Sequence, residues 1–453
     1  MNQTFTTSQK WKQFLIILLP ILITQISLSA ITFFDTNMSG HYSPQDLAGV
    51  AIGASLWIPI QTGLSGILMG ITPIVSQLIG SGRKSDVRFN VIQALYFAVT
   101  IAILILLVGS FVIGPVLEFM SLEDRVQSVA YYFLCAISFG VIPLFGYTVL
   151  RNFMDSLGQT RITMIITLIS LPINILLNYL LIFGHFGFPR LGGVGAGVAS
   201  ACTYWIIFFI SIVVVHRIRP FAEYGVFRKW HGPSIRKWKE LLTIGIPIGF
   251  AIFFETSVFS AVTLFMSRFD TATIAAHQAA LNFASTLYMI PLSISMSLTI
   301  LVGFEVGARR LQDAKKYSII GIGSAVTLSL LTAVVLIVFG KQVAGIYSTD
   351  PIVIDLIQHF LVYAIFFQIS DAVATPVQGS LRGYKDVSPA FIITFIAFWV
   401  IGLPFGFITA TYTTLGPYGY WIGLIVGLGC GAFALLWRLV RIQRKYNQKL
   451  TSK

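Results

Sequence analysis

Long apolar segments alternate with short polar connections along the whole chain. At 1.5 Å per residue, each segment is long enough to cross a hydrocarbon core of about 30 Å as a helix. In lipid, helices satisfy all their backbone hydrogen bonds internally. The pattern predicts an all-α polytopic membrane protein with twelve transmembrane helices, over residues 13–38, 47–79, 90–117, 127–150, 162–184, 192–215, 241–266, 273–304, 317–340, 352–377, 387–410 and 415–437.

Basic residues gather in alternate connections. All of the 30 Lys and Arg residues except Arg125, Arg190, Arg268 and Lys341 fall on one side of the predicted membrane or in the two tails. The positive-inside rule makes that side cytoplasmic. We therefore expect both termini in the cytoplasm, with anionic membrane lipids rather than nucleic acid as partners of the net charge of +13.

The chain carries an internal duplication. Gly-Ser-Gly-Arg-Lys-Ser-Asp-Val-Arg at 80–88 returns as Gly-Ala-Arg-Arg-Leu-Gln-Asp-Ala-Lys at 307–315, an offset of 227 residues. With six spans in each half, the repeats are parallel and enclose a central cleft. The predicted organisation is an N-terminal lobe at 1–216, a basic cytoplasmic linker at 217–239, and a C-terminal lobe with a basic tail at 240–453.

Composition narrows the function. With 56% apolar and 10% charged residues, the chain is not a soluble globular protein. Cys135, Cys202 and Cys430 stand singly in apolar segments and are expected to be packing residues. No phosphate-binding loop, His-Glu-x-x-His or Gly-x-Ser-x-Gly motif is present. We therefore expect no enzyme and no cofactor, and the energy for any active transport would come from an ion gradient.

Three acidic residues fall inside apolar segments: Asp35, Glu255 and Asp371. An ionised carboxylate at the bilayer centre costs at least about 2.5 kcal/mol, so such residues usually face the protein interior and carry ions or protons. No basic residue lies in the apolar part of the same segments. For Asp35 a second interpretation stays open, in which it lies near the outer end of its span and pairs locally.

Polar residues of the fifth and sixth spans extend the first-half set. Asn174 and Asn178 are four residues apart and share one helix face, and Ser200 lies in a small-residue segment. Together with Asp35 they could form an oxygen cage for a hard cation such as Na⁺. Alternatively, the two asparagines only hydrogen-bond neighbouring helices.

The second half differs chemically, because the offset of 227 places the counterpart of Asp35 at Val262 and not at Glu255. Aromatic faces and carboxylates attract lipophilic cations, so the aromatic residues of this half are candidates for a substrate cavity. Packing against lipid or neighbouring helices is the other interpretation of each one. The residues concerned are Phe253, Phe254, Phe259, Phe265, Phe283, Tyr288, Phe366, Phe367 and Trp399.

Three further motifs are similar to those of one transporter family. They are Phe-Asp-Thr-Asn-Met-Ser-Gly at 34–40, Met-Asp-Ser-Leu-Gly-Gln-Thr-Arg at 154–161, and Gly-Val-Gly-Ala-Gly-Val-Ala-Ser at 193–200. With twelve spans in two halves, the whole chain resembles the MATE (multidrug and toxin extrusion) family. Glu255 and Asp371 resemble the acids of its bacterial NorM branch.

This resemblance implies a bacterial inner-membrane antiporter, expected to be a monomer, that exports cationic drugs in exchange for Na⁺ or H⁺ by alternating access. It implies a cation site at Asp35, Asn174, Asn178 and Ser200, the last replacing the usual Thr, and a second one at Glu255 and Asp371 with Tyr288 as partner. A related-fold flippase for a lipid-linked precursor is the alternative, and it would need a more cationic cavity. The candidate cavity residues are Tyr288, Phe253, Phe254, Phe283 and Phe367.

Overall fold

The computed structural model describes residues 3–120, 122–228 and 230–451. Eleven helical segments in these ranges, and the bent pair of α5 and α6, are long and apolar enough to cross a membrane, which confirms the all-α class and the predicted number of spans. The elements are α1 Thr7–Tyr42, α2 Pro44–Leu68, α3 Ile71–Gly80, α4 Lys84–Phe119, α5 Asp124–Ser138, α6 Val141–Ser156, α7 Thr160–Phe183, η1 His185–Gly187, α8 Gly193–Arg217, η2 Phe221–Tyr224, α9 Ile235–Met266, α10 Thr271–Gly307, α11 Leu311–Tyr347, α12 Pro351–Gly383, α13 Val387–Phe395, η3 Ile396–Gly402, α14 Leu403–Tyr412 and α15 Tyr418–Thr451.

Most helices extend past the predicted apolar segments into polar sequence at one or both ends, whereas α7 ends, and α8 and α15 begin, slightly inside them. Of the basic residues used to orient the chain, Lys229 and Lys453 lie outside the described residues, as does the side chain of Lys449.

The chain divides into two compact units. Leu19–Gly249 form the first unit, whereas Asn2–Leu18 and Phe250–Lys453 form the second. Two helices are therefore shared: α1 begins in the second unit and continues in the first, and α9 begins in the first and continues in the second. The predicted lobes at 1–216 and 240–453, and the cleft between them, stay a prediction.

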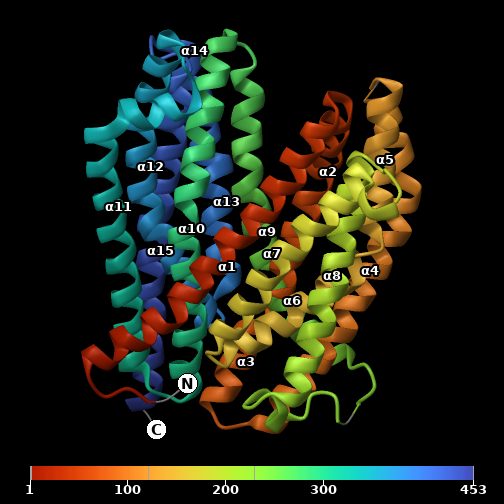
Figure 1. Cartoon of the computed structure of the whole chain (residues 1–453). Coiled ribbons are helices and arrows are strands. Elements are labelled where there is room, and N and C mark those ends of the chain that lie inside the picture. Colours follow the sequence, from red (N-terminus) through yellow and green to blue (C-terminus); the bar gives the residue numbers. More distant parts are fainter. Residues whose placement is uncertain (1–2, 121, 229, 452–453) are drawn as a thin grey trace. The chain divides into compact units, whose positions relative to one another are not determined.

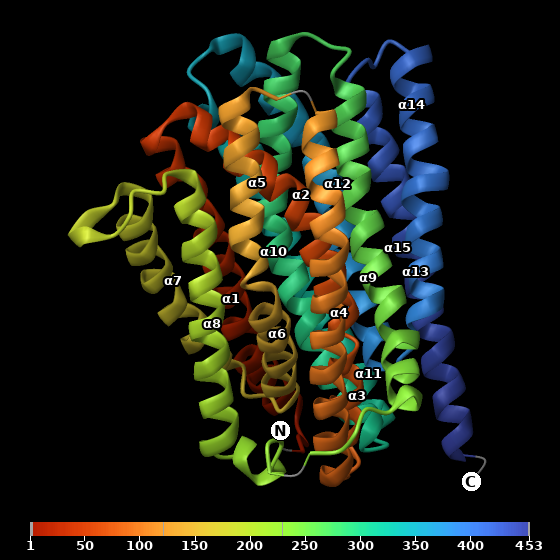
Figure 2. The same cartoon turned by 90° about the vertical axis from the view of Figure 1, so that its right-hand side faces the viewer.

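Packing inside each unit repeats the same scheme. In the first unit, α5 and α6 together pack against α2, α4 and α8 (Figure 2). In the second unit, α12 packs against α10, α11 and α15, and these helices run side by side in Figure 1. The two versions differ in continuity, since α5 and α6 are bent by 51° where α12 is one helix.

Gly402 and Gly406 of the eleventh span and Gly423 of the twelfth span allow close helix packing. A Cβ atom added to Gly423 would lie 2.4 Å from the Gly406 Cα and 2.4 Å from the Gly402 carbonyl oxygen, so α15 touches the backbone of the preceding span. That span contains the π-helical segment η3, which ends two residues before Pro404. Because proline cannot donate a backbone hydrogen bond, a local change of helix type is expected there.

Asp270 sets the start of α10, the helix that carries Tyr288. Its carboxylate accepts the Thr273 hydroxyl at 2.7 Å and the Thr273 backbone N–H at 3.2 Å. These two bonds favour the ionised form and lower the pKa of the Asp270 carboxyl. The cap thereby satisfies one of the free N–H groups of the first helical turn.

The start of α1 and the end of α15 both belong to the second unit and lie at the same end of its helices (Figures 1 and 2). An even number of spans requires this arrangement. The cytoplasmic location of that end stays a prediction from the basic residues.

Candidate ion-binding sites

Asp35 of α1 lies in a closed ring of side-chain hydrogen bonds in the first unit. One carboxylate oxygen accepts the Asn178 amide at 2.6 Å, and the other accepts the Ser200 hydroxyl at 2.8 Å. The Asn178 side-chain amide also donates to Asn174 Oδ1 at 3.1 Å. The Asn174 side-chain amide donates to the Ser200 hydroxyl at 3.5 Å and so closes the ring. The structure therefore brings together the four residues of the first-half set.

One buried oxygen of this ring is unused. Asn178 is fully buried, and its Oδ1 atom has no hydrogen-bond partner among the described residues. A buried carbonyl oxygen without a partner costs free energy, so it calls for an explanation such as a bound ion or water. Its position beside a carboxylate makes Asn178 a candidate cation ligand.

The start of α8 brings Ser200 close to α7. A Cβ atom added to Gly195 would lie 2.6 Å from the Leu181 carbonyl oxygen, so only glycine permits this approach of the two helices. The Gly193 backbone N–H donates to the buried Asp46 carboxylate at 2.7 Å, which fixes where α8 begins. The small residues therefore have a definite packing role.

Two polar residues near Asp35 were not predicted. Tyr204 lies one turn after Ser200 on α8, interacts electrostatically with Asp35, and forms a side-chain hydrogen bond with Gln61 of α2. The i, i+4 spacing from Ser200 is the sequence signal that could have identified Tyr204. No comparable signal pointed to Gln61, because α2 carried no predicted site residue.

The second unit holds a site of different composition. Glu255 of α9 and Asp371 of α12 are both buried and close enough to interact electrostatically. Tyr288 of α10 forms side-chain hydrogen bonds with Glu255 and with Thr375 of α12. The Thr375 hydroxyl also donates to Asp371 Oδ1 at 2.7 Å. Thr375 was not predicted, although it lies one turn after Asp371.

An unpartnered oxygen is present here as well. Asp371 is 1% exposed, and its Oδ2 atom has no hydrogen-bond partner among the described residues. A buried carboxylate oxygen is more costly to leave unsatisfied than a neutral one. Two buried acids that face one another repel when both are ionised, so a cation or proton shared between them would stabilise the pair.

Arg382 is the basic residue that sequence reasoning placed elsewhere. The distribution of basic residues places it on the cytoplasmic side after the tenth span, but it belongs to α12, is only 6% exposed, and interacts electrostatically with Glu255 and Tyr288. A buried positive charge therefore lies within electrostatic range of Glu255.

The predicted cavity aromatics lie in different surroundings. Phe367 is buried and packs edge-on against Phe259 at 5.5 Å. Phe254 joins a cluster with Trp399, whose indole N–H donates to the Phe254 carbonyl at 3.0 Å. Phe253 is 41% exposed and Phe283 is partly exposed, so the role of this set as a cavity lining stays a prediction.

Two helical units, each with buried carboxylates inside apolar helices, define a polytopic membrane transporter. The MatE family model matches residues 20–180 and 247–408, one segment in each half of the chain. The chain belongs to the MATE family of transporters. It is thus a secondary transporter and not an enzyme.

Curated relatives match over nearly the full length. A "Probable multidrug resistance protein NorM" of Bacillus cereus is 59% identical over 446 residues, covering 98% of both chains. The protein of the same name from Bacillus subtilis is 57% identical over 449 residues, covering 99% of both chains.

Solved structures share the fold. The eukaryotic MATE transporter AtDTX14 superimposes with a TM-score of 0.85 at 19% identity, covering 98% of this chain and 99% of that one. The Vibrio cholerae MATE transporter VcmN, in its bent form, gives a TM-score of 0.84 at 20% identity, with the same coverage of 98% and 99%. At these identities the likeness shows the fold alone.

Proposed function

We propose that this protein is a multidrug efflux antiporter that exports organic cations in exchange for Na⁺ or H⁺. It would act as a monomer in the bacterial inner membrane, with both termini in the cytoplasm. The observation that carries the proposal is the pair of buried acidic sites, each with an oxygen that has no hydrogen-bond partner in the described part of the chain: Asn178 Oδ1 in one unit and Asp371 Oδ2 in the other. The names of the relatives support multidrug substrates.

In the first unit, the ring around Asp35 is arranged for an ionised carboxylate. Asn178 and Ser200 each donate one hydrogen bond to it. If a proton or Na⁺ occupies Asp35, the carboxylate no longer needs the Asn178 donor. Rotation of that amide would turn its unused Oδ1 toward the ion and break the bond to Asn174. Ion binding would thereby change how α1 is held against α7.

In the second unit, Glu255 and Asp371 would share the coupling ion or a cationic substrate. With both acids ionised and Arg382 charged, the three groups sum to one negative charge. Entry of a single monovalent cation would neutralise the site, and a second cation would no longer be attracted. Competition between the coupling ion and the drug for this charge is the basis of exchange.

The coupling ion sets different geometric demands on the two sites. A proton needs only one carboxylate oxygen and one acceptor, whereas Na⁺ needs several oxygen ligands at once. The first-unit ring supplies such a set, from Asp35, Asn174, Asn178 and Ser200. We therefore expect Na⁺ to use the first unit if the cycle is sodium-driven.

Ethidium efflux from proteoliposomes tests the function directly. Proteoliposomes that contain the purified protein are loaded with ethidium, and either an inward Na⁺ gradient or an inward proton gradient is imposed. Export above the rate of empty liposomes with one gradient, and its loss when that gradient is collapsed by an ionophore, supports antiport. Equal efflux with and without both gradients would refute coupling.

A further inference from the structure

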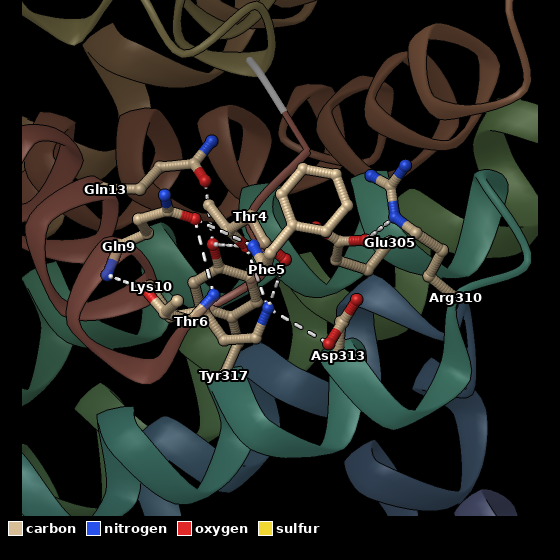
Figure 3. A network of polar contacts seen from close by, with 10 residues as sticks. All are labelled: Thr4, Phe5, Thr6, Gln9, Lys10, Gln13, Glu305, Arg310, Asp313 and Tyr317. Carbon is tan, nitrogen blue, oxygen red and sulfur yellow. Dashed lines mark hydrogen bonds and ion pairs between the residues drawn. The ribbon is translucent and has the colours of Figure 1, made fainter.

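The start of α1 is fastened to the first turns of α11 by a polar network, all of it within the second unit (Figure 3). Lys10 is fully buried, and its ammonium lies 3.0 Å from Asp313 of α11. The same ammonium donates to the Thr4 carbonyl and to the Thr4 hydroxyl, each at 2.8 Å. Its three N–H donors therefore have three acceptors.

Tyr317 completes the network one turn beyond Asp313. Its hydroxyl donates to the Gln13 side-chain Oε1 at 2.7 Å and lies 3.1 Å from the Thr4 hydroxyl, while its ring lies 5.5 Å from the Lys10 ammonium. Thr4 therefore accepts from Lys10 and donates to Tyr317. Residues on both sides of the start of α1 are thus held to α11.

A capping box fixes the segment that precedes the helix. The Gln9 backbone N–H donates to the Thr6 hydroxyl at 3.2 Å, and the Gln9 side-chain oxygen accepts the backbone N–H groups of Thr6 at 3.3 Å and Phe5 at 2.8 Å. This reciprocal pattern sets the first turn of α1 and positions Thr4 for Lys10 (Figure 3). Docking of α1 is therefore specified by sequence.

The duplication shows that this fastening is specific to the second unit. By the offset of 227, Lys10 corresponds to Lys237 and Asp313 to Asp86. In the first unit these two counterparts form separate local pairs, Lys237 with Glu240 at 2.9 Å and Asp86 with Arg83, and all four side chains are partly exposed. The same positions thus carry a buried pair in one unit and solvated pairs in the other.

Glu305 accounts for the difference. The counterpart of Arg83 is Arg310, which in the second unit bonds to Glu305 at 2.5 Å instead of the acid three residues later. The first-half counterpart of Glu305 is Leu78, so no acid competes there. Glu305 withdraws Arg310 from Asp313, and Asp313 is left to accept Lys10.

We propose that the Lys10–Asp313 pair is a conformational latch, which holds the start of α1 to α11 in the state described here and opens in another step of the transport cycle. The reasoning rests on the proposed function. Because α1 begins in one unit and carries Asp35 in the other, a rearrangement of the units must either release this contact or bend the helix. A buried ion pair adds little stability compared with apolar packing. It does favour two distinct states: a closed one in which the charges are paired, and an open one in which water solvates both charges.

Cross-linking distinguishes release from bending. In a parent with Cys135, Cys202 and Cys430 replaced by Ala, we would introduce Lys10→Cys and Asp313→Cys and bridge them with a short bis-methanethiosulfonate reagent. Ethidium efflux should fall at least fivefold and recover on reduction, whereas adding the reagent to either single-cysteine variant should not change the efflux rate of that variant. Efflux at the parental rate in fully bridged protein would overturn the latch and favour bending of α1 at Pro20, which has no N–H to donate.

Hydrogen exchange tests the latch without cysteines and without transport. In Asp313→Asn, backbone amides of residues 7–18 should exchange at least fivefold faster than in wild type, with α12 and α15 unchanged. Faster exchange throughout the second unit would overturn the proposal, because the pair would then be a general stabilising contact. Failure of the antiport proposal would show separately, as absence of gradient-driven efflux from the wild type.

Discussion

The two acidic sites occupy units with the same packing scheme, yet they solve the problem of a buried carboxylate differently. In the first unit, neutral amide and hydroxyl donors satisfy both oxygens of Asp35. In the second unit, Asp371 has one hydroxyl donor and one oxygen without a partner among the residues that the structure describes. It interacts with a second acid, Glu255, which in turn interacts with Arg382. A duplicated fold therefore conserves the scaffold while the chemistry diverges, and the two sites should respond differently to the same substitution.

The largest effect is expected from Asp35→Asn. The substitution keeps the size of the side chain but removes the only carboxylate of the ring, so no ion is attracted to the first unit. Gradient-driven ethidium efflux should fall to the level of empty liposomes. Asp86→Asn, the same chemical change at a partly exposed turn, is the control and should transport normally. Substantial efflux by Asp35→Asn would remove the first site from the coupling mechanism.

In the second unit, single neutralisations should be milder. Glu255→Gln and Asp371→Asn each leave one acid that can still attract a cation, so we expect a partial loss of roughly tenfold, or about 1.4 kcal/mol. The double variant should be as inactive as Asp35→Asn. Equal and complete inactivation by both single variants would show that transport needs both acids, and that one acid cannot bind the cation without the other.

Thr375→Val tests the second site alone, because it removes the hydroxyl that donates to Asp371. The Thr375 hydroxyl stabilises the ion-free form of Asp371, and a hydrogen bond to a charged group contributes about 1.5–3 kcal/mol. Without it, the coupling ion should bind more tightly, and its half-saturating concentration for efflux should fall roughly tenfold while the maximal rate also falls. Thr375→Ser, which keeps the hydroxyl, serves as the control. A raised half-saturating concentration would contradict this role.

The sequence predicted the helical class, the number of spans and the meeting of Asp35 with Asn174, Asn178 and Ser200. These inferences succeeded because apolar length and i, i+4 spacing are local properties that a membrane helix preserves. The capping box at Thr6 and Gln9 has an equally local signal, the Thr-x-x-Gln pattern before an apolar segment.

Contacts that depend on distant segments were not predictable in this way. Arg382 belongs to the basic residues predicted on the cytoplasmic side, and its burial was not predicted, because it depends on how α12 packs. The exchange of partners by Arg310 and Asp313 needs the fold, since only the structure shows that Lys10 meets α11. The sharing of α1 and α9 between units has no local sequence pattern.

The smallest effect is expected from Ser200→Ala, the first-unit counterpart of the Thr375 test. Asp35 would lose the Ser200 donor but keep the Asn178 donor, so the ion-free form is only partly destabilised. In a proton-driven cycle the half-saturating proton concentration should fall by about threefold. This change is smaller than the one expected when a hydrogen bond to a charged group is lost completely. In a sodium-driven cycle Ser200 would also be a ligand, and losing it should cancel this gain. Ser200→Thr keeps the hydroxyl and should match the wild type in both cases.

Comparison with Thr375 locates Na⁺ coordination, because Thr375 is not a proposed ligand. If the half-saturating concentration responds to Ser200→Ala differently with Na⁺ and with H⁺, but responds to Thr375→Val in the same way with both ions, Na⁺ is coordinated in the first unit. The same response to both ions at Ser200 would instead limit its role to hydrogen bonding with Asp35.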